Sequence, residues 1–144
     1  MGAKRAEQEV EIEAPPEEVF AAITDYETFP DWQSAVKECE VLERDAEGRG
    51  STVAFAVDAK VKEVRYRLRY HYDFPRRIWW DYLEGDVKSV DGSLDLEDLG
   101  GRTRATYRLE IDPGVFLPGP LRRVLVDQVM RGFVRELKAR VEDG

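Results

Sequence analysis

Cysteine and histidine are almost missing from this chain. Its 144 residues include one cysteine, Cys39, and one histidine, His71. A lone cysteine cannot form an intrachain disulfide, and sparse cysteine is typical of proteins from reducing compartments. Cys39 lies between Glu38 and Glu40, whose carboxylates disfavour a reactive thiolate. With so few nitrogen and sulfur ligands, we predict no bound metal.

Long hydrophobic runs are also missing. The first residues, MGAKRAEQE, contain no apolar segment like that of a signal peptide. No run elsewhere approaches the roughly 20 apolar residues that a helix needs to cross a bilayer. We therefore expect no membrane span and a cytoplasmic location.

Positive charge is in deficit over most of the chain. The 30 Asp and Glu residues outnumber the 22 Lys and Arg residues, which gives a net charge of −8. Contacts with a phosphate backbone need clustered Lys and Arg, so we predict no DNA partner. Only the C-terminal segment is locally basic, and a protein partner remains open at that end.

Sequence motifs for nucleotide binding and covalent catalysis are absent too. The chain has no glycine-rich phosphate loop, no dinucleotide fingerprint and no supportable Ser/His/Asp set, so we expect no cofactor. His71 alternates in phase with the arginines of its segment rather than with the tyrosines. This phase predicts that His71 lies on an outer surface, where it is poorly placed to act as a catalytic base.

What is present is typical of a folded globule. Hydrophobic residues make up 42% of the chain and aromatic residues 10%, although 36% of the residues are charged. A chain of this length buries about two-thirds of the surface that its unfolded form exposes. We predict a single domain over residues 1–144.

Alternation of apolar and polar residues predicts an antiparallel sheet. In the longest example, Tyr66, Leu68 and Tyr70 share one face, and the arginines between them share the other. We interpret that arginine row as a solvated face paired with carboxylates such as Asp81. Short turns, among them the hairpin turn at 99–101, join the later strands and favour antiparallel pairing. The predicted strands are 6–13, 36–43, 52–58, 64–72, 77–83, 87–97 and 103–111.

Helical periodicity occurs in two places. After the first strand, residues 17–26 and 28–34 predict two short helices. Two Pro-Gly steps at 113–114 and 118–119 end the last strand, and a long helix then runs over 121–141. The class is therefore α+β, with a twisted sheet of about seven strands curled around one long helix. The predicted apolar stripe of that helix contains Leu121, Val124, Leu125, Gln128, Val129, Phe133, Leu137 and Val141.

Several segments together resemble a known superfamily. They are EIEAPPEEVF at 11–20, ITDYETFPDW at 23–32, WDYLEGD at 80–86, Gly92, and TYRLEI at 106–111. In these segments the chain resembles the START-like polyketide cyclase/dehydrase superfamily, in the branch of coenzyme-Q-binding and ribosome-association proteins. The resemblance covers nearly the whole chain. It implies the helix-grip fold, in which a curved antiparallel sheet wraps the C-terminal helix and leaves an apolar cavity between them.

The concave face of such a sheet is the predicted ligand site. Core packing and pocket lining both remain open for its aromatic residues. Several tyrosines share that face, and a buried hydroxyl without a partner costs roughly 1–3 kcal/mol, which favours a pocket holding water or a ligand. The predicted ligand-binding residues are Phe55, Tyr66, Leu68, Tyr70, Trp80, Tyr82 and Tyr107 of the sheet, with Gln128, Val129 and Phe133 of the helix.

Three functions fit this reading, because the superfamily carries several on one scaffold. The first is binding or transport of a hydrophobic small molecule: a lipid, an isoprenoid quinone or an aromatic polyketide. The second is a polyketide aromatase/cyclase that uses the same cavity without a metal or nucleotide cofactor. That chemistry needs positioned acid and base groups, and no inward histidine or carboxylate is predicted. The third is a protein-interaction module of the ribosome-association type, which would use the basic face of the C-terminal helix and the arginine row as a docking strip.

Overall fold

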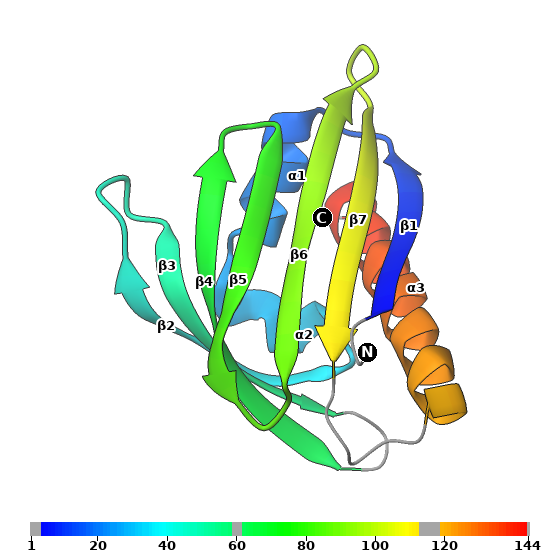
Figure 1. Cartoon of the computed structure of the whole chain (residues 1–144). Coiled ribbons are helices and arrows are strands. Elements are labelled where there is room, and N and C mark those ends of the chain that lie inside the picture. The colour runs from blue at the N-terminus through cyan, green and yellow to red at the C-terminus, as the bar shows by residue number, and fades with distance from the viewer. Residues whose placement is uncertain (1–3, 59–61, 113–118, 144) are drawn as a thin grey trace.

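The computed structural model describes residues 4–58, 62–112 and 119–143, and it confirms the α+β class. Within these residues seven antiparallel strands form one sheet in the order β1-β7-β6-β5-β4-β3-β2. Figure 1 shows the sheet curving, with the helices all on one side of it. The strands are β1 (Lys4–Ile12), β2 (Val36–Arg44), β3 (Gly50–Asp58), β4 (Glu63–Asp73), β5 (Arg77–Gly85), β6 (Ser89–Asp98) and β7 (Thr103–Asp112).

The strand order follows from the connections. Strands β2 to β6 each pair with the next strand along the chain, as the predicted hairpins require. Strand β1 instead pairs with β7, so that Ala6 lies opposite Leu109 and Val10 opposite Ala105. The helical segment after β1 carries the chain to the other edge of the sheet, where β2 begins. Both edges therefore come from the N-terminal part of the chain.

The short helices begin where the sequence predicts. Helix α1 (Pro16–Ile23) starts at a proline, and Glu17 and Glu18 lie in its first turn, where carboxylates suit the helix dipole. The second predicted helix is divided into a 3₁₀ turn, η1 (Tyr26–Thr28), and one turn of α-helix, α2 (Phe29–Trp32). Phe20, Ile23, Tyr26 and Phe29 are buried against the sheet side.

The long helix α3 (Gly119–Asp143) packs against the edge strand β1 rather than along the middle of the sheet (Figure 1). The Lys138 ammonium donates a hydrogen bond to the Glu11 carbonyl over 2.7 Å. The Glu13 amide donates to the Glu142 carboxylate over 2.8 Å. The predicted Pro-Gly steps before this helix fall largely on residues 113–118, which lie outside the described residues, as do the side chains of Leu121 and Leu125.

The buried face of α3 is rotated around the helix axis relative to the predicted apolar stripe. Leu137 is buried as expected, but Val124 is 51% exposed and Gln128 is exposed. Among the described side chains of α3, the other buried ones are Val126, Met130 and Val134, none of which was in the predicted stripe. Periodicity shows that a helix has an apolar side, but which residues lie at the middle of the buried face depends on the elements that pack against the helix. Here one flank packs on β1 and α1 while the next faces the interior.

Gly85 marks a break in the sheet. Its φ of +146° is rare for other residues, and a Cβ there would lie 2.4 Å from the Arg65 carbonyl oxygen. The β4–β5 register shifts nearby, between Arg67 and Leu68. Beyond Trp80, opposite Gly92, no further β5–β6 pair forms within the described residues. The two strands therefore separate at this end of the sheet.

Candidate ligand-binding cavity

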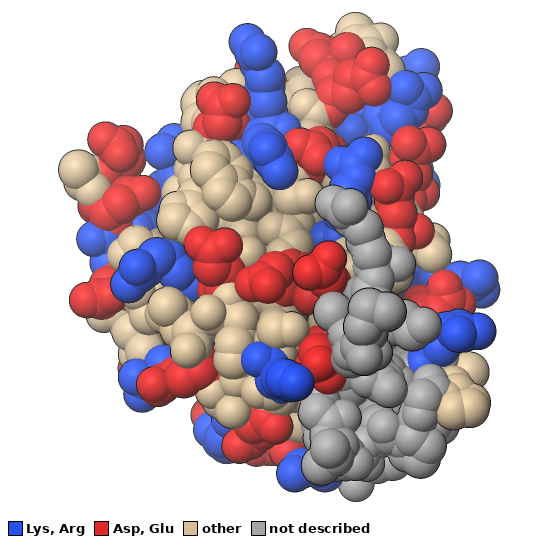
Figure 2. Space-filling model, in the orientation of Figure 1, with Lys and Arg blue, Asp and Glu red and all other residues tan. Residues whose placement is uncertain are grey.

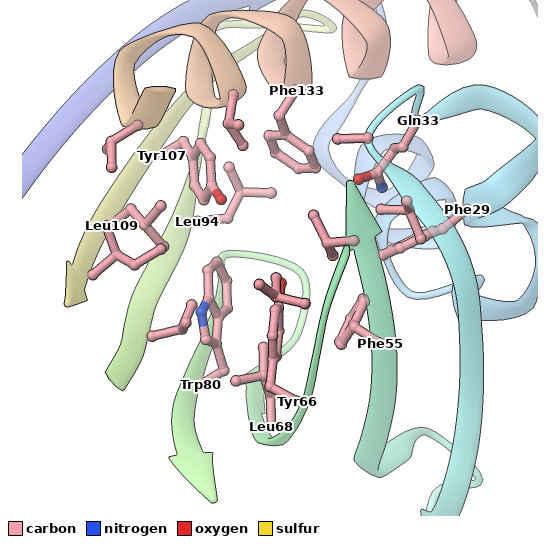
Figure 3. A pocket seen from close by; sticks show the side chains of 18 of the residues that line it. Phe29, Gln33, Phe55, Tyr66, Leu68, Trp80, Leu94, Tyr107, Leu109 and Phe133 are labelled. Atoms are coloured by element: carbon pink, nitrogen blue, oxygen red, sulfur yellow. The ribbon is translucent and has the colours of Figure 1, made fainter. Parts of the chain in front are cut away.

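An apolar cavity of about 170 Å³ lies between the inner face of the sheet and the helices. Figure 3 shows side chains from strands and helices converging on it. Native interiors contain few voids larger than a water molecule. An engineered cavity of about 150 Å³ in another protein binds benzene. This cavity therefore has room for a compact ligand of one or two rings.

Aromatic rings form a continuous wall around the cavity. Tyr70 and Trp80 have ring centroids 5.5 Å apart, Trp80 and Tyr107 6.0 Å, and Tyr107 and Phe133 4.6 Å. Phe55 extends the wall, with its ring 6.4 Å from that of Tyr70. These spacings suit offset or edge-to-face packing. The wall thus joins β3, β4, β5, β7 and α3.

Gly92 sets the position of the Trp80 indole. The two residues lie opposite each other on β6 and β5. A Cβ at position 92 would come within 2.6 Å of the Trp80 ring and 2.6 Å of the Arg108 carbonyl oxygen. A larger residue would therefore displace the indole or the strand. Glycine lets the ring lie close over β6 and form part of the cavity wall.

Three tyrosine hydroxyls of the cavity have no hydrogen-bond partner among the described residues. No hydrogen bond joins the hydroxyls of Tyr66, Tyr70 and Tyr107 to any other residue in the described part of the chain. Figure 3 shows the Tyr66 and Tyr107 side chains reaching into the cavity. Burial raises the pKa of all three phenols well above the usual range. They are therefore neutral at pH 7 and free to donate to a ligand.

Gln33 adds an amide to the cavity. Its side chain is 7% exposed, and its Nε2 has no hydrogen-bond partner within the described residues. Backbone hydrogen bonds hold the residue in place. The backbone N–H of Gln33 donates to the Phe29 carbonyl over 2.8 Å, and the backbone N–H of Val36 donates to the Gln33 carbonyl over 3.0 Å. The next amide, of Ser34, donates to the Glu136 carboxylate of α3 over 3.2 Å.

Most of the predicted ligand-binding residues meet in this cavity. The structure brings together Phe55, Tyr66, Leu68, Tyr70, Trp80, Tyr107, Val129 and Phe133. The strand alternation accounts for the first six, because inward residues share one parity. Val129 and Phe133 lie one turn apart on α3.

Tyr82 and Gln128 do not line the cavity, so this placement was wrong. Tyr82 has the inward parity, but it lies where β5 has left β6. Its hydroxyl donates to the Val87 carbonyl, and its amide donates to the Asp91 carboxylate over 2.9 Å. It therefore bridges the gap between the separating strands. Gln128 is exposed because α3 turns a different side inward.

Other residues, which were not predicted, also line the cavity. Leu94 and Val90 share the parity of Gly92 on β6, so strand alternation could have identified them. Asp58 and Glu136 also line the cavity, where no carboxylate was predicted, and the Glu136 carboxylate accepts a hydrogen bond from the Ser34 amide. The missed residues include Ile23, Phe29, Gln33, Ala35, Val36, Val57, Asp58, Val64, Ile78, Val87, Val90, Leu94, Leu109, Ile111, Val126 and Glu136.

The lone histidine and the lone cysteine lie outside the cavity. His71 is on the outer face, as predicted, with its Nε2 2.8 Å from the Asp81 carboxylate and its ring stacked on Trp79. Burial, with a smaller effect from Glu27, raises the pKa of Cys39 to about 12. The thiol therefore stays protonated at neutral pH and is a poor nucleophile.

The structure bears on two kinds of feature that the sequence does not predict, a metal site and a membrane-spanning helix. No group of three or more His, Cys, Asp or Glu side chains in residues 4–58, 62–112 and 119–143 could hold a metal ion. In the same ranges, no helix is both long enough and apolar enough to span a bilayer.

Comparison with known proteins gives a family and a fold. Residues 3–142 match the family described as polyketide cyclase / dehydrase and lipid transport. A START superfamily protein from Mycobacterium smegmatis is 22% identical, with a TM-score of 0.88 over 96% of this chain and 97% of that one. An aromatase/cyclase from Streptomyces sp. R1128 is 17% identical, with a TM-score of 0.85 over 97% and 94%.

A third solved structure, of a protein from Thermus thermophilus, is 26% identical, with a TM-score of 0.81 over 96% of this chain and 97% of that one. A search of the curated proteins found no match. The structures share the curved sheet and C-terminal helix over nearly their whole length.

Proposed function

The chain belongs to the polyketide cyclase/dehydrase and lipid transport family, and from this premise we propose that it binds a small hydrophobic molecule in its internal cavity. The observation that carries the proposal is the cavity of about 170 Å³ with an aromatic wall, in which the Gln33 Nε2 and three tyrosine hydroxyls have no partner among the described residues. Small-molecule sites are mostly apolar pockets with a small number of polar groups that orient the ligand.

The size of the cavity favours a compact aromatic ligand. A planar ring system of one or two rings fits a space slightly larger than one that holds benzene. A long lipid chain or an isoprenoid tail would need the sheet and α3 to separate further. The rings of Trp80, Tyr107 and Phe133 offer faces and edges against which a flat ligand packs well.

The test uses tetralin, a compact hydrocarbon, as a probe for the cavity itself. We expect tetralin to bind the wild type, measured by calorimetry or by a change in tryptophan fluorescence. The Val129→Trp variant should weaken binding by about tenfold or more, because the added indole fills the space that a ligand would occupy. Val124→Trp is the matched control, since Val124 is 51% exposed on the same helix.

Failure of tetralin to bind the wild type would remove the proposal. Equal binding by wild type and Val129→Trp would place the probe elsewhere on the protein. Native mass spectrometry of protein purified from cells provides a second readout, in which a co-purifying hydrophobic molecule is expected and should be depleted in Val129→Trp.

Catalysis by an aromatase/cyclase mechanism is the second candidate. A long poly-β-ketone chain, like a lipid chain, would need more room than the cavity of about 170 Å³. For a shorter substrate the phenols are placed to donate hydrogen bonds to an oxygen that becomes negative during aldol closure. Proton transfer is most efficient when the pKa of the acid lies near the working pH. The pKa values of Tyr66, Tyr70 and Tyr107 are raised far above neutrality, so these phenols suit binding better than acid catalysis.

Docking of a protein through the outer arginine row has less support. Arg65 pairs with Glu38 and Glu63, and Arg67 with Glu84. On α3 the two charges Arg131 and Lys138 pair with acidic residues one turn away on the same helix. An acidic partner would have to displace these internal pairs. Loss of ribosome co-sedimentation at physiological salt would argue further against this role.

A further inference from the structure

The side-chain amide of Gln33 is the polar group that the fold itself leaves unexplained. Among the described residues, its Nε2 is the one side-chain nitrogen or oxygen atom that is itself fully buried and has no hydrogen-bond partner, whereas Tyr66, Tyr70 and Tyr107 carry their unpaired hydroxyls in the cavity lining. In native proteins the large majority of buried side-chain polar atoms have a partner, and each exception needs a reason. Gln33 is 7% exposed and lies in the lining of the cavity.

The backbone around Gln33 keeps this amide at the cavity. Hydrogen bonds to the Phe29 carbonyl and from the Val36 amide hold the residue between α2 and β2. The adjacent Ser34 is tied to Glu136 of α3. Figure 3 shows the Gln33 amide on the side formed by α2 and β2, with Tyr107 on the opposite side. A ligand between them would touch the aromatic wall and reach Gln33 at one end.

The charges of the lining limit what that ligand can be. Its ionisable side chains, apart from the neutral tyrosines, are the carboxyl groups of Asp58 and Glu136, and no Lys or Arg is present among the described lining residues. A carboxylate or phosphate in this apolar space would lose its hydration without gaining a cation. A neutral ligand avoids that loss. The Nε2 group is a donor only, so the ligand atom that meets it must be an acceptor.

Building on the proposed binding function, we propose that Gln33 is a specificity-determining residue whose amide donates a hydrogen bond to a carbonyl oxygen of a neutral ligand with one or two fused rings. The partner is a ketone, quinone or similar oxygen carried on a ring. The hydrocarbon part of the ligand fills the aromatic cavity, and the oxygen satisfies the Gln33 amide. The same molecule without its oxygen leaves that amide unpaired.

A matched pair of probes tests this directly. Tetralin and 1-tetralone have the same ring skeleton and differ by one carbonyl group. We expect replacement of Gln33 by methionine, a side chain of similar length without a donor, to weaken 1-tetralone binding by about tenfold. Tetralin binding should change by less than about threefold, since its contacts are apolar. Nuclear magnetic resonance should show the Gln33 side-chain amide signals moving on addition of 1-tetralone, with much smaller changes for tetralin.

The control is Gln128→Met, the same substitution at an exposed position on α3, which should leave both affinities unchanged. Tetralin binding by Gln33→Met also reports that the variant retains a folded cavity. If Gln33→Met weakens both probes equally or neither, the role of Gln33 is overturned while the hydrophobic site stands. If the wild type binds neither probe, the proposed function fails together with this inference.

Discussion

The two faces of the sheet treat polar groups in opposite ways. On the outer face, charged side chains from neighbouring strands pair with one another. Arg108 of β7 lies 2.9 Å from Glu7 of β1 and 2.6 Å from Asp95 of β6, and Asp95 also meets Arg77 of β5 at 3.3 Å. Figure 2 shows the two signs of charge intermixed over the face that it displays. Charged groups on the outer face are therefore largely paired with one another.

On the inner face, polar groups are few, and several have no partner in the part of the chain that the structure describes. The hydroxyls of Tyr66, Tyr70 and Tyr107 make no hydrogen bond to other described residues, and neither does the Gln33 Nε2. The same strand carries both kinds of residue, since Tyr66 alternates with Arg65 and Arg67 on β4. The unpaired inner groups, and not the more numerous charged groups of the outer face, therefore indicate where a ligand would bind.

The largest effect that we predict from this contrast is unfolding at alkaline pH. Burial is the leading cause that raises the pKa of Tyr66, Tyr70 and Tyr107 above the ordinary value of 10.0. In the unfolded chain these phenols ionise near pH 10. The folded state therefore keeps its full stability below pH 10 and loses stability as the pH rises above 10. We expect tyrosinate absorbance from the cavity phenols to appear only together with complete unfolding, followed by circular dichroism.

The outer ion pairs should contribute little to this transition, because the carboxylates are already ionised and arginine remains charged. The chain has six tyrosines, three of them outside the cavity lining. Tyrosinate absorbance equivalent to more than three phenols in a chain with native circular dichroism would therefore contradict the buried placement of the cavity phenols.

Two neighbours on β6 give the next largest contrast. Leu94 faces inward with 0% exposure, whereas Asp95 faces outward and pairs with Arg77 and Arg108. Leu94→Ala should lower the free energy of unfolding by about 2–5 kcal/mol, because it removes buried methyl groups and enlarges the cavity. Asp95→Ala should lower it by less than about 1 kcal/mol, since exposed ion pairs contribute little. Urea denaturation measures both.

Equal losses for the two variants would mean that the outer network stabilises the sheet as strongly as the core does. Wild-type protein in high salt is the matched control, because added salt weakens exposed ion pairs and leaves Leu94 packing in place.

Local patterns in the sequence predict most of the fold and of the aromatic wall. Period-two alternation placed Tyr66, Leu68 and Tyr70 on one face of β4, and their inward position follows from geometry alone. Gly100 and Gly101 have φ values of +91° and +86°, which the predicted hairpin turn requires. Such signals are local, so one sequence suffices to read them.

The errors arise where tertiary packing decides. Tyr82 keeps the inward parity, yet β5 separates from β6 beside it, and no periodicity encodes where pairing stops. Gln128 lies on the predicted apolar stripe of α3, but the helix packs against β1 and turns that position to solvent. Gln33 is a single polar residue after a one-turn helix. Its burial and its missing partner emerge only when α2, β2 and α3 meet.

The smallest effect that we predict is a difference in the free energy of unfolding between two Tyr-to-Phe variants. The Tyr72 hydroxyl donates to the Gly50 carbonyl and lies 2.6 Å from the Tyr26 hydroxyl, whereas the Tyr107 hydroxyl has no partner among the described residues. Tyr72→Phe should lower the free energy of unfolding by about 1 kcal/mol, because it removes hydrogen bonds made within the protein. Tyr107→Phe should change it by less than about 0.5 kcal/mol without ligand, since it removes a hydroxyl that the fold does not use.

Thermal and urea unfolding of both variants, without added ligand, measure this difference, and the shared Tyr-to-Phe change makes each variant the control for the other. A loss for Tyr107→Phe as large as that for Tyr72→Phe would show that the Tyr107 hydroxyl is already satisfied inside the protein. The cavity would then offer fewer donors than its geometry indicates, and Gln33 would be left to orient a ligand with less help from the phenols.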